Sequence, residues 1–275
     1  MSQVMVDREL GRFELAYQID GGGDAVGRCG FMFLGGFKSD MTGNKAEALA
    51  ALARATRRRN LRFDYSGHGQ SSGAFTEGTI SDWLEQCVHM YLTHTKSKVI
   101  VVGSSMGGWL ALLLARKLRE EDSFAFRRLG GLVLLAPAAD MTQELMWNKF
   151  DDRAKAMLRD TGLYLEPSLY GAPYEITSRL LADGLQHCIL PTGLTLPCPI
   201  RILQGDKDPD VPPAHAIKTF DALSGLVLLR RCAPSSPDTA GLATGVALLL
   251  PSACQPGTAA SRAARRSSRI VPIRR

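Results

Sequence analysis

A serine stands between two glycines in the run Gly103-Ser104-Ser105-Met106-Gly107, which is a G-x-S-x-G pattern. The apolar run Val99-Ile-Val-Val102 precedes it, and an apolar stretch with helical character, 106–118, follows it. A turn this tight between a strand and a helix leaves no room for side chains two residues before or after the serine, so both positions favour glycine. The pattern therefore predicts that Ser105 is a nucleophile at a strand-to-helix elbow, suited to attack on esters or thioesters.

Two backbone amides are predicted to stabilise the negative charge that attack on a carbonyl creates. The Met106 N–H stands at the N-terminus of the predicted helix, where the helix dipole favours an anion. The Phe37 N–H stands in the loop Gly35-Gly36-Phe37, where glycine lets the backbone approach a substrate. The alternative for this loop is an ordinary glycine turn.

Three aspartates follow a late predicted strand, 200–204, and one of them has the spacing of a catalytic acid. Asp208 lies in the run G-x-x-D-x-x-V-P, from Gly205 to Pro212. An acid at a strand end orients an imidazole and stabilises its charged form. Asp206 and Asp210 are predicted to form turns by bonding their own backbone, and a turn built from all three is the alternative.

The chain has no histidine after the last predicted strand, 226–229, which is where a base for Ser105 is expected. A serine nucleophile needs a base within hydrogen-bond reach to accept its proton. His187 and His215 are the two candidates for a substitute, although neither stands at the end of that strand. The sequence therefore predicts that this chain is poorly active. The histidines of the chain are at positions 68, 89, 94, 187 and 215.

Strand-like and helix-like segments alternate along the chain, which predicts an α/β fold with a mostly parallel sheet and helices on both faces. In such sheets, binding sites form at the carboxyl ends of the strands, and every motif above stands at one. Strands are expected at 13–19, 29–34, 60–64, 98–103, 129–136, 200–204 and 226–229, and helices at 44–58, 79–94, 106–118 and 213–223.

The net charge of +6 is concentrated at the C-terminal end and does not indicate nucleic-acid binding. Residues 225–275 hold eight arginines and one acid, a charge of +7, so the preceding 224 residues carry −1. This segment also lacks lysine, glutamate and aromatic residues. Such a composition is typical of GC-rich DNA translated in a shifted frame. The alternative is a genuine basic tail that binds an acidic partner or a membrane surface, and the coding DNA decides between them.

Four blocks resemble the branch of the α/β-hydrolase superfamily related to the mitochondrial acyl-protein thioesterase, and the likeness extends over about residues 12–224. They are Gly35-Gly-Phe-Lys-Ser-Asp-Met-Thr-Gly-Asn-Lys45, Arg62-Phe-Asp-Tyr-Ser-Gly67, Val102-Gly-Ser-Ser-Met-Gly-Gly-Trp109 and Cys198-Pro-Ile-Arg-Ile-Leu203. The resemblance implies an α/β-hydrolase fold and a serine hydrolase that acts on acyl thioesters or esters without a metal or cofactor. Ser105 matches the family nucleophile, Asp208 the family acid, and Trp109 a residue just after the elbow.

The resemblance and the composition together predict a domain organisation. By resemblance, residues 1–224 form the hydrolase domain, with 141–197 as a helical lid within it. The change of composition marks 225–275 as an atypical basic tail that is irregular or disordered, or as a frame-shifted C-terminus. Trp109, Met141 and Trp147 are candidates to line an acyl pocket, while lid residues that form only a core are the alternative.

The partners follow from the same features. We expect an acyl ester or thioester as substrate, no nucleic acid and no stable membrane insertion; the sequence does not indicate an oligomeric state. No signal-like or spanning segment is evident, so a cytoplasmic location is expected, with a mitochondrial one as the alternative by resemblance. The alternative function is a non-catalytic hydrolase-like protein that binds an acyl ligand.

Overall fold

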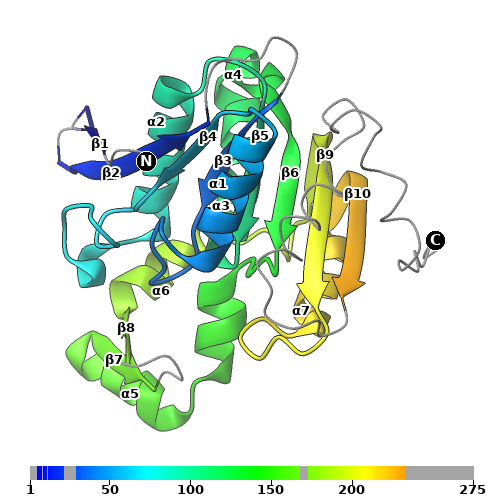
Figure 1. Ribbon diagram of the computed structural model, residues 1–275. Coiled ribbons are helices and arrows are strands. Elements are labelled where there is room, and N and C mark those ends of the chain that lie inside the picture. Colours follow the sequence, from blue (N-terminus) through cyan, green and yellow to red (C-terminus); the bar gives the residue numbers. More distant parts are fainter. Residues whose placement is uncertain (1–4, 8, 11, 22–28, 168–172, 233–275) are drawn as a thin grey trace.

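The computed structural model describes residues 5–7, 9–10, 12–21, 29–167 and 173–232 (Figure 1). The base for Ser105 was expected shortly after the last predicted strand, at about 233–238. These positions and the rest of the predicted tail after residue 232 lie outside the described residues. None of the described helices is both long and apolar enough to cross a membrane.

An eight-stranded, mostly parallel sheet forms the centre of the molecule, in the order β1-β2-β4-β3-β5-β6-β9-β10. Strands β1 and β2 are antiparallel to their neighbours. The other six strands of this sheet run parallel to one another, in the order β4, β3, β5, β6, β9 and β10. This arrangement confirms the predicted α/β class. The strands are β1 (Met5–Asp7), β2 (Leu15–Asp20), β3 (Gly30–Leu34), β4 (Asn60–Phe63), β5 (Val99–Ser104), β6 (Leu129–Leu135), β9 (Leu194–Gly205) and β10 (Leu223–Cys232).

Helices cover both faces of this sheet because successive strand residues point to opposite sides. On one face, α1 (Asn44–Ala55) packs through Leu49 and Ala53 against Phe31, Ile100 and Val133. On the other face, α2 (Ile80–His94) and α3 (Met106–Glu121) belong to a larger core with the alternate residues of the same strands. Two further helices are the short α4 (Ser123–Arg127) and α7 (Pro213–Ala222), which follows β9.

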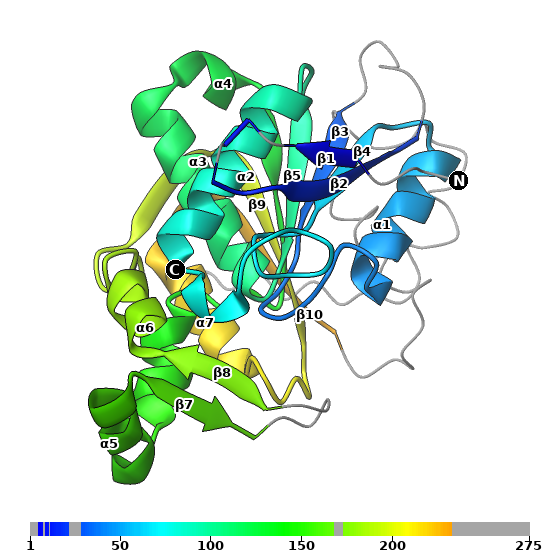
Figure 2. The same ribbon diagram turned by 90° about the vertical axis from the view of Figure 1, so that its left-hand side faces the viewer.

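The segment between β6 and β9 projects from the end of the sheet toward which the parallel strands run (Figures 1 and 2). It begins with a π-helical turn, η2 (Thr142–Met146), and a 3₁₀ turn, η3 (Trp147–Lys149). Helix α5 (Asp152–Thr161), the antiparallel strands β7 (Leu163–Glu166) and β8 (Tyr174–Thr177) and helix α6 (Ser178–Leu185) follow. The segment was predicted as a helical lid, and the structure adds to its helices the pair of strands β7 and β8. Strand β9 also begins before residue 197, the predicted end of the lid.

Strand β10 is longer than expected and reaches into the residues that were assigned to the tail. It pairs in parallel with β9 from Leu223 to Cys232, with an irregularity between Gly225 and Val227. At the end of this pair, the Asp206 N–H donates a hydrogen bond of 2.9 Å to Cys232 O. The sheet therefore continues eight residues past the predicted boundary at 224.

Candidate active site

Ser105 occupies the turn between β5 and α3 in a backbone conformation that side chains rarely adopt. Its φ is 54° and its ψ is −118°. A non-glycine residue held at such angles costs of order 1–3 kcal/mol and persists only where the surrounding structure imposes it. Three hydrogen bonds hold the Ser105 backbone in this conformation. Its N–H donates to Leu135 O at 2.9 Å, and its carbonyl oxygen accepts from the Gly108 and Ala138 amides at 2.9 and 3.0 Å. The strained serine is thus fixed between two strands and a helix.

Both glycines of the pattern are required by close backbone contacts. A Cβ at Gly103 would lie 2.2 Å from the carbonyl oxygen of Gly107. A Cβ at Gly107 would lie 2.1 Å from the carbonyl oxygen of Leu34, at the end of β3. The elbow therefore packs directly on the loop that follows β3, and this contact brings the predicted nucleophile and the predicted oxyanion loop together.

Ser105 opens onto a cavity of about 800 Å³, which is within the usual range for a small-molecule site. The loop after β3 forms one wall, the start of the lid a second, and the turn after β9 a third. Of the three predicted pocket residues, Met141 lines this cavity. The apolar and aromatic lining residues include Phe37, Met141, Leu145, Met146 and Tyr174, and charged residues such as Lys38, Lys149 and Glu166 also line the cavity.

Trp109 and Trp147 do not line the cavity, contrary to the prediction. Trp109 of α3 is fully buried in the core cluster that also contains residues of α2 and the sheet, and it is not among the residues that line the cavity. Trp147 is half-buried in the lid, where the Lys155 ammonium lies 5.3 Å from its ring centre. The sequence predicted their apolar character but not the direction in which they point. Leu145 and Met146 take their place in the wall.

The two predicted oxyanion donors come from the loop after β3 and from the start of α3. Phe37 lines the cavity, and a Cβ added to its neighbour Gly36 would lie 3.4 Å from Ser105 Cβ, so this loop passes close to the nucleophile. Met106 follows Ser105 at the first residue of α3. Neither the Phe37 nor the Met106 N–H donates to an acceptor among the described residues. Two unused amides beside a serine are the arrangement that an oxyanion requires.

Asp208 is half-buried in the turn after β9, and its carboxylate is engaged by the backbone. Its Oδ1 accepts hydrogen bonds from the Asp210 and Val211 amides, at 3.1 and 2.9 Å. Asp208 thus makes the kind of turn contact that was predicted for Asp206 and Asp210. Asp206 instead accepts a hydrogen bond of 2.6 Å from the Arg231 guanidinium of β10. The second oxygen of Asp208 has no hydrogen bond with a described residue, which leaves an acceptor for an imidazole.

Neither candidate for a substitute base lines the cavity that holds Ser105. His187 lies near α2, where its Nε2 is 2.7 Å from Ser81 Oγ. His215 is buried in α7; burial lowers its pKa, against a smaller opposing effect of a hydrogen bond with the Ala139 backbone. The described residues therefore hold no histidine in the position of a base for Ser105.

His68 is the residue of this site that the motif analysis did not assign. It is buried, and its Nε2 accepts the Lys38 N–H at 3.2 Å while its Nδ1 lies 3.1 Å from Ser66 O. Nδ1 is therefore the protonated nitrogen and Nε2 the acceptor. Lys38 itself has a φ of 55°, so this bond fixes a strained residue directly after Phe37. Burial lowers the pKa of His68 to about 4, with the positive charge of Lys38 adding to it and the hydrogen bond to Ser66 opposing it.

The neutral state of His68 makes its contribution to stability dependent on pH. Because the folded pKa is lowered, the contribution is complete above the unfolded value of 6.5 and is lost as the pH falls through about 4. We expect the difference in unfolding free energy between wild type and His68→Asn to narrow by about 2–3 kcal/mol from pH 7.5 to pH 4.5. Urea unfolding at both values measures it. A difference that stays constant would contradict a neutral, buried His68.

The sequence model of the Alpha/beta hydrolase family matches residues 33–248. The palmitoyl-protein thioesterase ABHD10, mitochondrial, of Homo sapiens is 33% identical over 188 residues, which cover 68% of this chain and 58% of that protein. The chain thus spans less than two thirds of that relative. The solved structure of alpha/beta hydrolase domain-containing protein 10 from mouse superposes with a TM-score of 0.73 at 26% identity, covering 90% of this chain and 98% of that one.

A protein from Agrobacterium vitis S4, known from a crystal structure, is more similar in shape, with a TM-score of 0.81 at 34% identity. The superposition covers 91% of this chain and 99% of that protein's chain. The region matched by the family model begins in β3 and includes the elbow, the lid and the turn after β9. With this match and the parallel sheet described above, the chain belongs to the α/β-hydrolase family.

Proposed function

We propose that this chain is a serine hydrolase that cleaves acyl thioesters or carboxylic esters through an acyl-enzyme on Ser105. The observation that carries the proposal is the strained Ser105, which opens onto a cavity between two unused amides. Ser105 Oγ attacks the acyl carbonyl, and the Phe37 and Met106 amides stabilise the oxyanion. The thiolate or alkoxide then leaves, and water releases the acid from Ser105.

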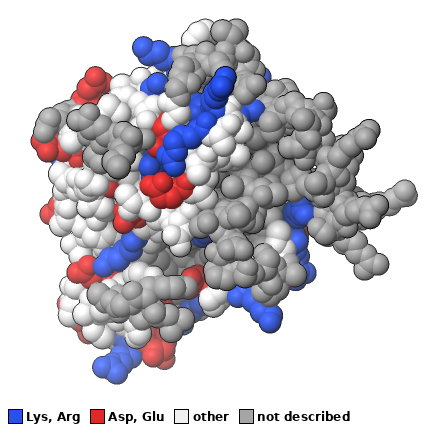
Figure 3. All heavy atoms as spheres, in the orientation of Figure 1, with Lys and Arg blue, Asp and Glu red and all other residues white. Residues whose placement is uncertain are grey.

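The lining of the cavity supports an apolar acyl group as the part of the substrate that is bound. Phe37, Met141, Leu145 and Met146 line the wall beside Ser105. Methionine side chains adapt to flexible ligands, which suits an acyl chain. On the face shown in Figure 3, basic side chains of the described residues lie beside acidic ones, which supports an acyl substrate over a polyanion such as nucleic acid.

The relatives support the thioester in particular and a mitochondrial setting. The human, bovine and mouse proteins are named palmitoyl-protein thioesterases and mitochondrial. We extend both the substrate class and the location to this chain as part of the proposal. The mitochondrial location thereby takes the place of the cytoplasmic one that was expected from sequence.

The missing base sets the expected rate. Ser105 must give up its proton as it attacks, and in a serine protease the loss of the triad histidine alone lowers kcat on the order of 10⁶-fold. We therefore expect acylation of Ser105 to be slow, with solvent as the proton acceptor. A hydrolase-like protein that binds acyl groups without turnover is the second candidate, and the absent histidine is the observation that favours it.

The test is hydrolysis of p-nitrophenyl esters with short, medium and long acyl chains, together with intact-protein mass measurement. We expect slow release of p-nitrophenol and an acyl adduct on wild type, and neither on Ser105→Ala. Imidazole added to the buffer should speed acylation of wild type, because it supplies the missing base. Equal rates for both proteins and no adduct would overturn the proposal, and tight binding of the acyl chain without an adduct would establish the second candidate.

A further inference from the structure

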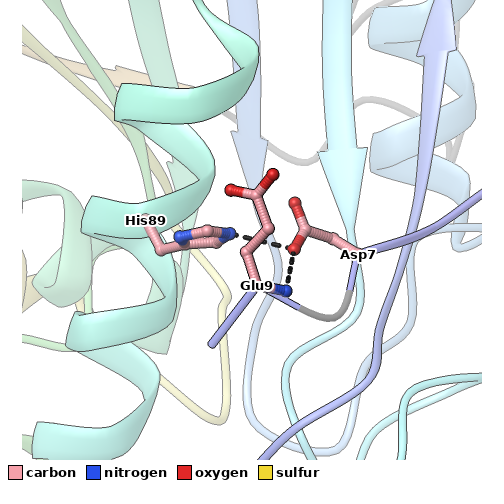
Figure 4. A group of neighbouring side chains, drawn as sticks. All are labelled: Asp7, Glu9 and His89. Atoms are coloured by element: carbon pink, nitrogen blue, oxygen red, sulfur yellow. Dashed lines mark hydrogen bonds and ion pairs between the residues drawn. The ribbon is translucent and has the colours of Figure 1, made fainter. Parts of the chain in front are cut away.

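A cluster of three potential metal ligands lies at the sheet edge formed by β1, where β1 meets α2 (Figure 4). It consists of Asp7 at the end of β1, Glu9 two residues later, and His89 of α2. One donor atom from each of the three lies within 4.8 Å of the others. Asp7 is buried, His89 is partly buried and Glu9 is exposed. The cluster is therefore open to solvent on one side and enclosed on the other.

The donor atoms of the cluster lie close enough to reach one ion after a small adjustment. His89 Nε2 lies 3.0 Å from Asp7 Oδ1. Nitrogen and oxygen ligands lie about 2.0–2.2 Å from Zn²⁺, so two of them on one tetrahedral ion are about 3.3–3.6 Å apart. The nitrogen and the oxygen therefore need to separate by only a few tenths of an ångström to share an ion. In the ion-free state a proton on Nε2 fills this gap.

A second histidine holds Asp7 in place for this role. His94 Nε2 lies 2.6 Å from Asp7 Oδ2, and the His94 ring packs on Tyr17 with centres 4.3 Å apart. The Glu9 N–H also donates to Asp7 Oδ1, at 2.9 Å. Asp7 is therefore an oriented carboxylate, as metal-binding carboxylates are when a second group fixes them.

We propose that Asp7, Glu9 and His89 bind a divalent transition-metal ion of the Zn²⁺ class, which ties β1 to α2. Asp7 Oδ1, a Glu9 carboxylate oxygen and His89 Nε2 are the ligands, and water completes the shell. The ion replaces the proton on His89 Nε2, which passes to solvent, while His94 keeps its bond to Asp7 Oδ2. One imidazole and two carboxylates favour Zn²⁺, Mn²⁺ or Co²⁺ over Mg²⁺ and Ca²⁺, which prefer oxygen alone.

The site is structural rather than catalytic because of its position. Among the described residues, β1 is a three-residue edge strand that pairs with the sheet only through β2. His94 stands at the C-terminal end of α2 and contributes to a small hollow with Gly30 and Val99, at the start of β3 and β5. Ser105 follows the opposite end of β5. A bound ion would therefore stabilise the sheet edge without contact with the cavity.

The test is titration of the untagged full-length chain with Zn²⁺ against a chromophoric chelator, for wild type and four variants. His89→Gln removes the nitrogen ligand but keeps a donor for Asp7, and Glu9→Gln changes only an exposed carboxylate. The matched controls are His187→Gln and Glu85→Gln. Glu85 lies on the same helix and bonds Arg12. We expect one Zn²⁺ per chain, at least tenfold weaker binding in His89→Gln and Glu9→Gln, and unchanged binding in both controls.

Two further readouts separate this site from the free cysteines Cys188 and Cys232. Bound Co²⁺ should show visible d–d bands without a thiolate-to-cobalt charge-transfer band. Zn²⁺ should slow hydrogen exchange of the amides from Met5 to Asp7 in wild type and not in His89→Gln. Binding that is equal in all five proteins, or a thiolate band that persists in His89→Gln, would overturn the proposal.

Discussion

Replacing Arg62 with methionine is expected to lower the free energy of unfolding by about 3–5 kcal/mol, because it leaves Asp20 buried without its principal partner. The Arg62 guanidinium donates to both carboxylate oxygens of Asp20, from Nε at 2.8 Å and from Nη2 at 3.3 Å. It also donates to Met41 O at 2.7 Å. Arg62 is 3% exposed and Asp20 is fully buried. Chemical denaturation of wild type and variant measures the loss.

A second arginine on the same carboxylate provides the control. Arg54 of α1 bonds Asp20 Oδ1 at 2.9 Å, but its side chain is 48% exposed. Water replaces an exposed partner at little cost, so Arg54→Met should lower the stability by less than about 1 kcal/mol. Equal losses in the two variants would show that the burial of Arg62 does not determine its contribution.

Gly107→Ala is expected to destabilise the chain, although alanine is the better helix former. On helix propensity alone, the substitution at this position of α3 would stabilise by about 1 kcal/mol. The new Cβ, however, would lie 2.1 Å from Leu34 O and 2.5 Å from Gly35 O. Both are backbone atoms, one at the end of β3 and one in the loop that carries Phe37, so neither can rotate away. We expect a net loss of about 3 kcal/mol or more, as the upper range of overpacked cores shows.

Gly108→Ala separates the clash from the propensity, because it changes the next residue of the same helix. Its Cβ would meet Pro137 Cβ at 2.9 Å and Pro137 Cα at 3.0 Å, contacts that are much less severe than the 2.1 Å contact at Gly107. The loss should therefore be smaller, about 1–2 kcal/mol, and the two midpoints of urea unfolding should differ clearly. If Gly107→Ala unfolded at or above the wild-type midpoint, the close contact between elbow and loop would be wrong.

The sequence predicted the parallel sheet well because its strands are buried on both faces. Runs such as Val99–Val102 are apolar without interruption, and such runs end in glycine or polar turns that mark the strand ends. The α/β class and the order of the major elements are confirmed. The elbow could be located for the same reason, since the motif has meaning only between a strand and a helix.

Short and surface-facing elements could not be predicted, because local patterns of three or four residues carry little information. β1 has three residues, and β7 and β8 have four each. β8 is paired only to β7, so tertiary contact rather than propensity decides its form. The same holds for side-chain direction: the pattern that placed Trp109 after Ser105 could not tell that α3 turns it into the core.

The role of His68 was missed for a different physical reason. It depends on a hydrogen bond to Lys38, thirty residues away, and on the buried neutral state that this bond requires. A histidine in a Gly-x-Gly turn carries no local sign of either. A positive φ at a lysine is equally invisible in sequence, because lysine has no preference for that region.

The parallel course of β10 determines where any downstream residue starts. Its last residue, Cys232, pairs with Gly205, so the chain leaves the sheet at the edge where Asp208 and Ser105 stand. A library that places histidine at successive positions just after Cys232 would therefore sample short tethers that begin at the same end of the parallel sheet as the nucleophile, with β9 and β6 between β10 and β5. Selecting this library for ester cleavage would therefore test whether a histidine placed after β10 can restore a catalytic base for Ser105.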